Sequence, residues 1–120
     1  MHYFCTMNVE NAQAQMRKGV LEFCILAIIS EGEIYPTDVI NRLKQSSLLV
    51  AEGTVYPLLN RLKTMELLSY KWVESSSGPP RKYYQLTEKG YQFLNELNKT
   101  WIELYNAVTI NTKHLNTIGK

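Results

Sequence analysis

The sequence is short of the residues from which metal centres, disulfide scaffolds and membrane spans are built. Its only histidines are His2 and His114, and neither has a second histidine or cysteine at metal-ligand spacing. Its only cysteines are Cys5 and Cys24. The longest apolar run, residues 23–29, is far below the roughly 18 residues of a membrane span. We therefore expect no metal, no cofactor and no membrane contact.

Other absences bear on the compartment and on catalysis. No charged segment precedes an apolar one at the amino end, as a secretory signal requires, so a reduced, cytoplasmic chain is expected rather than a disulfide scaffold. Cys24, inside the apolar run, is expected to behave as a small hydrophobe. The chain has no nucleophile–base pair, phosphate-binding glycine loop or paired carboxylates. We expect no catalytic residues and no enzyme activity.

What the chain does have is an ordinary globular composition and an uneven distribution of charge. Its 120 residues suffice for one domain, and 45% of them are apolar. The net charge is +2, yet residues 1–41 carry −3 and residues 90–120 carry +1. Residues 42–89, with eight basic against four acidic side chains, carry +4. A basic middle favours a polyanionic partner, although on charge alone a merely solvated surface explains it equally well.

The first half of the chain predicts a loose arm followed by three helices. Residues 1–14 are polar and lack periodic apolar positions. Residues 15–29 are apolar on nearly every side, which predicts a central helix wrapped by others; a buried strand is the alternative, but the length favours a helix. A second helix is expected from Pro36, a residue suited to a first helical turn, to Lys44.

The third helix, expected to start near Glu52 or Thr54, separates apolar from polar side chains most clearly. At 100° per residue, one side is apolar except for Glu66. That side holds Val55, Leu58, Leu59, Leu62 and Met65. The opposite side displays Gly53, Tyr56, Pro57, Asn60, Arg61 and Thr64.

A hairpin and a last helix follow. Residues 69–74 and 81–86 alternate as strands, and residues 75–80, rich in serine, glycine and proline, predict a loop between them. The last helix begins at Thr87, a suitable N-cap. Its apolar residues are spaced 3, 4, 3 and 4, which is a heptad seam. The seam consists of Leu94, Leu97, Trp101, Leu104 and Val108.

Three helices and a hairpin predict a mainly α (α+β) fold, the winged helix-turn-helix, with a long carboxyl-terminal dimerisation helix. The third helix offers hydrogen-bonding and basic side chains to a major groove, and the hairpin adds cations for phosphate. The predicted DNA-binding residues are Thr54, Tyr56, Asn60, Arg61, Lys63, Arg81 and Lys82. The alternative is a winged helix that binds only proteins, which would be expected to have an uncharged third helix.

The seam also predicts a homodimer. We expect no partner for it inside a winged helix of this length, so an isolated chain would expose a long apolar stripe. A two-fold partner covers the stripe and duplicates the third helix. The expected DNA is accordingly a double-stranded palindrome.

Two segments resemble the PadR-type bacterial transcription regulators: GTVYPLLNRLKTMELLSY and, most specifically, GPPRKYYQLTEKG. The resemblance covers about residues 15–105, and the single last helix is similar to the small, multidrug-sensing subfamily. The chain departs from the pattern in its amino-terminal arm and in Pro79 and Pro80 at the wing tip.

The resemblance implies a homodimeric repressor that a small molecule releases from DNA. From the expected elements, the DNA-binding domain is predicted at 15–86, between a flexible arm at 1–14 and a dimerisation helix and tail at 87–120. Trp101 lies where multidrug-sensing relatives keep a tryptophan that stacks on planar aromatic ligands, and it is equally a seam residue. Tyr83 is expected to be a hinge between wing and core, and Tyr84 and Leu86 are expected in the core.

Overall fold

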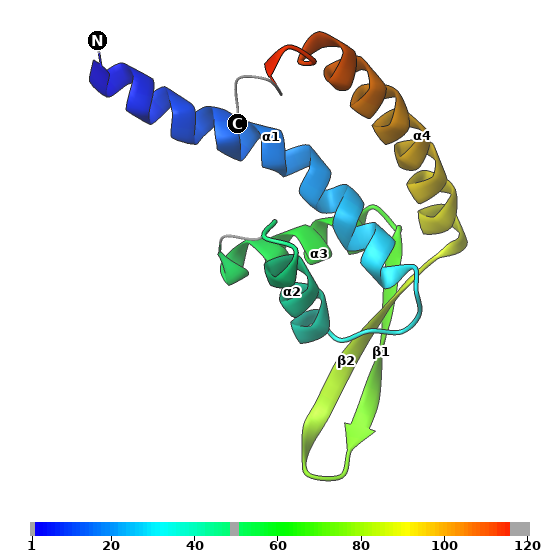
Figure 1. Cartoon of the computed structure of the whole chain (residues 1–120). Helices are drawn as coiled ribbons and strands as arrows, with labels where there is room; N and C mark the ends of the chain where they lie inside the picture. Colours follow the sequence, from blue (N-terminus) through cyan, green and yellow to red (C-terminus); the bar gives the residue numbers. More distant parts are fainter. Residues whose placement is uncertain (1, 49–50, 116–120) are drawn as a thin grey trace.

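The computed structural model describes residues 2–48 and 51–115, so residues 116–120 of the expected tail lie outside it, as do the side chains of residues 2–7. Its elements, in chain order, are α1 (His2–Ile29), α2 (Pro36–Gln45), a 3-10 turn (Glu52–Thr54), α3 (Val55–Thr64), β1 (Leu68–Ser75), β2 (Gly78–Leu86) and α4 (Glu88–Asn111). Figure 1 shows α2 and α3 beneath the carboxyl half of α1, with the hairpin projecting away from the helices. This is the predicted winged helix-turn-helix with a long last helix.

The core lies where the carboxyl half of α1 meets α2, α3 and the base of the hairpin. Ile25, Leu26 and Ile29 are fully buried, so the apolar run is the predicted central helix. The side chains packed around them are Val39, Ile40, Leu43, Val55, Leu59, Leu62, Leu67, Leu68, Tyr84 and Leu86. Cys24 is a half-buried free thiol, and burial raises its pKa. Tyr84 and Leu86 are core residues, as expected.

The amino-terminal segment differs from its prediction. Residues 2–14 are not a loose arm but the first turns of α1, which runs unbroken for 28 residues. The physical reason is propensity rather than burial: the stretch from Ala12 to Lys18 consists of strong helix formers, and neither glycine nor proline precedes Gly19. The prediction weighed apolar periodicity alone, which this exposed stretch lacks.

The hairpin turn is tighter than predicted. Ser76 and Ser77 alone form the turn, while Pro79 and Pro80 belong to β2 rather than to a loop over residues 75–80. Prolines are tolerated there because the outer edge of a two-stranded ribbon has no neighbour that needs their N–H groups. At its base the ribbon gains a neighbour, where the Ile34 amide donates to the Tyr84 carbonyl at 3.1 Å.

The start of α4 is fastened tightly to the end of α3. Thr87 is the predicted N-cap, and its Oγ1 accepts from the Gly90 amide at 2.9 Å. The backbone N–H of Thr87 donates to the Leu67 carbonyl at 3.0 Å. Gly90 lies so close to that carbonyl that a Cβ atom at this position would overlap it. The first turn of α4 therefore requires glycine.

Beyond the core, α1 and α4 project as two diverging arms (Figure 1). The radius of gyration is 17.4 Å, against about 14 Å for a compact chain of this length. The predicted seam is divided: Leu94 and Leu97 pack on the core, contrary to the expectation that the whole seam lacks a partner within the chain. Leu104 and Val108 are 54% and 56% exposed. No helix in the described ranges is both apolar and long enough to cross a lipid bilayer.

Candidate nucleic-acid interface

The outer face of α3 presents the predicted side chains to solvent. Tyr56 is 51% exposed, and Asn60 and Lys63 are exposed as well. Spacings of four and three residues place these side chains on one stripe of the helix. Thr54 is exposed in the 3-10 turn just before the helix. The stripe ends beside the hairpin, because the Lys63 ammonium lies 5.1 Å from the centre of the Tyr70 ring.

Arg61 differs from the other predicted residues of α3 in having a partner within the chain. Its guanidinium forms an ion pair with the carboxylate of Glu22 on α1. The Arg61 guanidinium also donates a hydrogen bond to this carboxylate. The hydrogen bond and the negative charge of Glu22 raise the pKa of Arg61 above its ordinary value, so Arg61 is a permanent cation held against α1. Because 39 residues separate the pair in the chain, the helical pattern of α3 gave no sign of it.

The two predicted wing cations lie on opposite faces of the hairpin. The Arg81 guanidinium stacks 3.6 Å from the centre of the Tyr35 ring and donates to the Thr37 hydroxyl at 3.3 Å, next to the start of α2. The Lys82 ammonium lies 4.3 Å from the Tyr70 ring centre and 5.3 Å from that of Trp72. The pair Arg81-Lys82 is therefore two sites rather than one.

Strand alternation explains which side each cation occupies. One face, here called the helix-side face, is buried at its base through Leu68, Tyr84 and Leu86 and continues outward as Tyr70, Trp72 and Lys82. The other, the outer face, carries Lys71, Arg81 and Tyr83, and Lys71 pairs there with Glu33. The helix-side face is the one that adjoins the exposed stripe of α3.

Tyr83 lies on the outer face and stacks on Tyr35, with ring centres 4.1 Å apart and 18° between the planes. A hydrogen bond between the two hydroxyls is the main cause of the raised pKa of Tyr83. The stack joins the hairpin to the segment that leads into α2. Tyr35, Tyr70, Trp72 and Glu22 were not among the residues predicted for the site. The alternation of residues 69–74 could have placed Tyr70 and Trp72 on one face.

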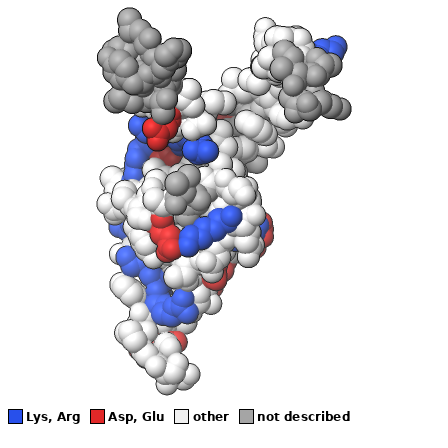
Figure 2. Space-filling model, turned by 60° about the vertical axis from the view of Figure 1, so that its left-hand side comes forward, with Lys and Arg blue, Asp and Glu red and all other residues white. Residues whose placement is uncertain are grey.

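Three cations near the wing differ in their partners from Lys71 and from the basic residues of α2. Arg42 and Lys44, on α2, form ion pairs with carboxylates. Within the part of the chain that the structure describes, Lys63, Arg81 and Lys82 lie over aromatic rings and take part in no ion pair with a carboxylate. Figure 2 shows basic side chains, with acidic ones among them, over the helices and the upper hairpin, and little charge near the hairpin tip. The charges of these three cations are therefore not neutralised within the protein.

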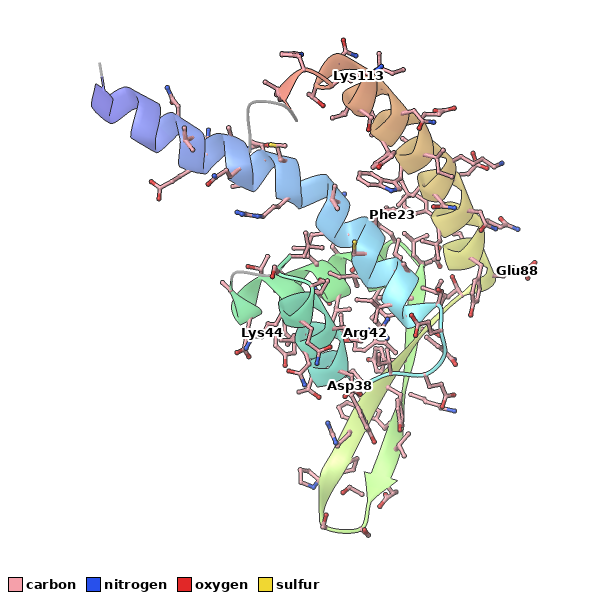
Figure 3. The ribbon with its side chains drawn as sticks, viewed as in Figure 1. Phe23, Asp38, Arg42, Lys44, Glu88 and Lys113 are labelled. Atoms are coloured by element: carbon pink, nitrogen blue, oxygen red, sulfur yellow. The ribbon has the colours of Figure 1, made fainter. Side chains whose placement is uncertain are left out.

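A separate hollow of about 310 Å³ lies between α1 and α4. Phe23 points from α1 toward α4 (Figure 3), and its ring centre is 6.3 Å from that of Trp101. Trp101 is 38% exposed and also contacts Tyr105, at 6.0 Å between ring centres. Gln15, Met16, Gly19 and Leu97 are among the other residues that line it. The residues that line this hollow belong to α1 and α4, and none of them belongs to α3.

Comparison with protein families and solved structures places this geometry in a known group. The model of the transcriptional regulator PadR-like family matches residues 25–96. A PadR-like transcription factor from Bacteroides fragilis is 55% identical, with a TM-score of 0.70, over 82% of this chain and 96% of its own. A PadR-like transcriptional regulator from Bacillus cereus is 42% identical, with a TM-score of 0.71, over 79% and 93%.

One more distant structure contains nucleic acid. Bacillus subtilis PadR, in complex with operator DNA, is 25% identical with a TM-score of 0.59. The match covers 65% of this chain and 46% of that one. The family match spans more than half of this chain and includes α2, α3, the hairpin and the start of α4. The chain therefore belongs to the PadR-like family of transcriptional regulators.

Proposed function

We propose that this chain regulates transcription by binding a palindromic double-stranded operator, with α3 in the major groove and the wing on the adjacent backbone. The observation that carries the proposal is the exposed stripe Tyr56–Asn60–Lys63, which leads to Lys82, a wing cation that forms no ion pair with a carboxylate of the described residues. The relative from Bacillus subtilis solved with operator DNA supports it. The alternative, a winged helix that contacts only proteins, does not require this surplus of positive charge.

The side chains divide by the groups they can offer to DNA. Asn60 carries an amide that can form two hydrogen bonds with an adenine edge, so we assign it to base reading. Tyr56, one turn earlier on the same stripe, and Thr54, in the 3-10 turn before α3, offer further hydrogen-bonding groups. Lys63, Arg81 and Lys82 are assigned to phosphates. Arg61 is also assigned to phosphate, a contact for which Glu22 competes in the free protein.

Base-reading and phosphate-binding residues are distinguished by the salt dependence of binding. Arg81→Ala and Lys82→Ala are each expected to weaken binding to operator and scrambled duplexes alike. Each should reduce the slope of log K against log salt by about 0.9 per protomer, because fewer counterions are released. Asn60→Ala should weaken operator binding by about 1–3 kcal/mol with little change in slope. Fluorescence anisotropy at several salt concentrations measures both quantities.

The scrambled duplex is the control for this series. Equal losses on both duplexes in Asn60→Ala would show that α3 does not read bases. If the wild-type protein binds neither duplex and is not retained on heparin at low salt, the result favours the alternative of a winged helix that binds only proteins.

We propose further that the operator-binding form is a homodimer, in which a second copy covers the arms of α1 and α4. The apolar side chains of α4 beyond the core support this, because Trp101, Leu104 and Val108 are exposed in one chain. Much of the amino half of α1 is exposed as well, and an isolated helix of that length is marginally stable in water. Two-fold pairing would also supply two copies of α3 for the palindrome.

We propose that the regulator is a repressor and that a planar aromatic molecule bound in the α1–α4 hollow releases it from DNA. Phe23 and Trp101 offer ring faces there, which favour stacking of a flat ligand. The sequence has two tryptophans, so Trp72→Phe leaves Trp101 as the single indole emitter. A planar aromatic dye that does not itself bind duplex DNA is expected to quench this emission and to lower operator affinity in the same titration. Unchanged emission at saturating dye would contradict the assignment of the hollow.

A further inference from the structure

We propose that the helix-side face of the wing is a second DNA-contacting surface, on which the indole of Trp72 packs against deoxyribose while Lys82 binds the neighbouring phosphate. This inference rests on the proposed function and extends it to an aromatic residue that the sequence analysis did not assign to DNA. Its partner is the duplex backbone beside the segment that α3 reads.

The first argument is the exposure of Trp72. Its side chain is 61% exposed, although it is the largest apolar group on the hairpin. Among the described residues, its ring lies edge-to-face with that of Tyr70, at 6.3 Å between ring centres, and 5.3 Å from the Lys82 ammonium. The exposed indole therefore offers a flat apolar face next to a cation, which is a combination that suits a sugar–phosphate backbone.

The second argument is continuity with the outer face of α3. Lys63, at the end of the exposed stripe, and Lys82, on the wing, both lie over the ring of Tyr70, at 5.1 and 4.3 Å. A shallow groove lies between α3 and β1, lined by Lys63, Tyr70 and Trp72 together with Glu66. A duplex resting on α3 would therefore meet the helix-side face before the outer face.

The third argument is the pairing of chemical groups. Deoxyribose offers C–H groups that suit the flat face of an indole, and the phosphate beside it offers charge to an ammonium. Lys82 lies opposite Trp72 in the strand register, so both groups project from one step of the ribbon. Two rings restrain the ammonium before DNA arrives, which lowers the ordering entropy that binding must overcome. The surface carries no base-specific arrangement, so it should act on all sequences alike.

The emission of Trp72 tests the inference directly. In Trp101→Phe, Trp72 is the single tryptophan, and a duplex from the gene's own upstream region is titrated into it while anisotropy of the labelled DNA records binding. The indole emission is expected to change with the same Kd as the anisotropy, and acrylamide should quench it several-fold less in the complex. Trp72→Ala in the otherwise unchanged chain is expected to weaken binding to operator and scrambled duplexes about five- to tenfold, with the salt slope preserved.

Val73→Ala is the matched control, because Val73 adjoins Trp72 in β1 but projects to the outer face; its affinity should stay within twofold of the wild type. Tight binding with unchanged Trp72 emission and quenching, or wild-type affinity in Trp72→Ala, would overturn the inference while the proposed function stands. Absence of DNA binding by the wild-type protein would overturn both. The affinity measurement on Trp72→Ala is made in a chain that keeps Trp101. It therefore remains interpretable even if Trp101→Phe weakens the dimer.

Discussion

Gly90→Ala is expected to destabilise the protein, although alanine is the better helix former. The new methyl group would overlap the carbonyl oxygen of Leu67, and this carbonyl cannot retreat freely because the Thr87 amide donates to it at 3.0 Å. Either α4 shifts or the capping contact at its start is lost. Overpacking of this kind lowers the free energy of unfolding by about 1–3 kcal/mol. Urea denaturation followed by circular dichroism measures the change.

Gly19→Ala provides the matched control in α1. Apart from its chain neighbours and the backbone of its own helix, no described atom lies within 4 Å of the place that its Cβ would occupy. Here the higher helix propensity of alanine is not opposed by a steric overlap. The substitution is therefore expected to raise the free energy of unfolding by about 0.5–1 kcal/mol. The two substitutions should therefore have opposite signs. A Gly90→Ala protein as stable as the Gly19→Ala protein would mean that α4 moves away from Leu67 without loss.

The second large effect is expected from Leu104→Glu. Leu104 is 54% exposed in one chain, so a carboxylate there should leave folding of the monomer intact. In the proposed dimer the same carboxylate would be buried against an apolar partner, which is strongly unfavourable. Sedimentation analysis should find monomers. Operator affinity should fall by about 100-fold or more, because the two half-sites can no longer be bound by one linked pair of α3 helices.

Asn106→Glu controls for the added charge. Two residues beyond Leu104 correspond to a rotation of about 200°, so Asn106 projects from the opposite side of α4. Dimer and operator affinity should both survive this substitution. If Leu104→Glu remains dimeric and binds the operator normally, the two copies associate through another surface.

The motif RKYYQLTEKG illustrates what sequence reasoning could reach. The resemblance to the family correctly assigned Tyr84 and Leu86 to the core, and the N-cap preference correctly assigned Thr87 to the start of α4. The role of Gly90 was not predictable in this way, because its neighbour is a backbone carbonyl on a different element. Local periodicity reports which face a side chain occupies but not which distant group it meets.

The same distinction explains the outcome at the candidate site. Helical spacing correctly predicted that Tyr56, Asn60 and Lys63 would be exposed. It could not predict the Arg61–Glu22 ion pair, which depends on how α1 crosses α3. Arg81 and Lys82 are consecutive residues of a strand, so strand alternation alone implies that their side chains point to opposite faces. The prediction nevertheless grouped them as a single basic pair. The hairpin register places Lys82 beside Trp72, whereas Tyr35, the ring partner of Arg81, lies outside the hairpin and depends on the tertiary fold.

The crossing of α1 has a mechanical consequence. Glu22, which holds Arg61 of α3, and Phe23, which faces Trp101 of α4, are consecutive residues on one continuous helix. Consecutive side chains are fixed at about 100° to each other around the helix axis. A rotation of α1 that enlarges the hollow on the side of Phe23 must therefore swing the Glu22 carboxylate through the same angle. The residue that lines the aromatic hollow and the residue that restrains Arg61 of α3 are joined by one peptide unit, so they turn together whenever α1 rotates.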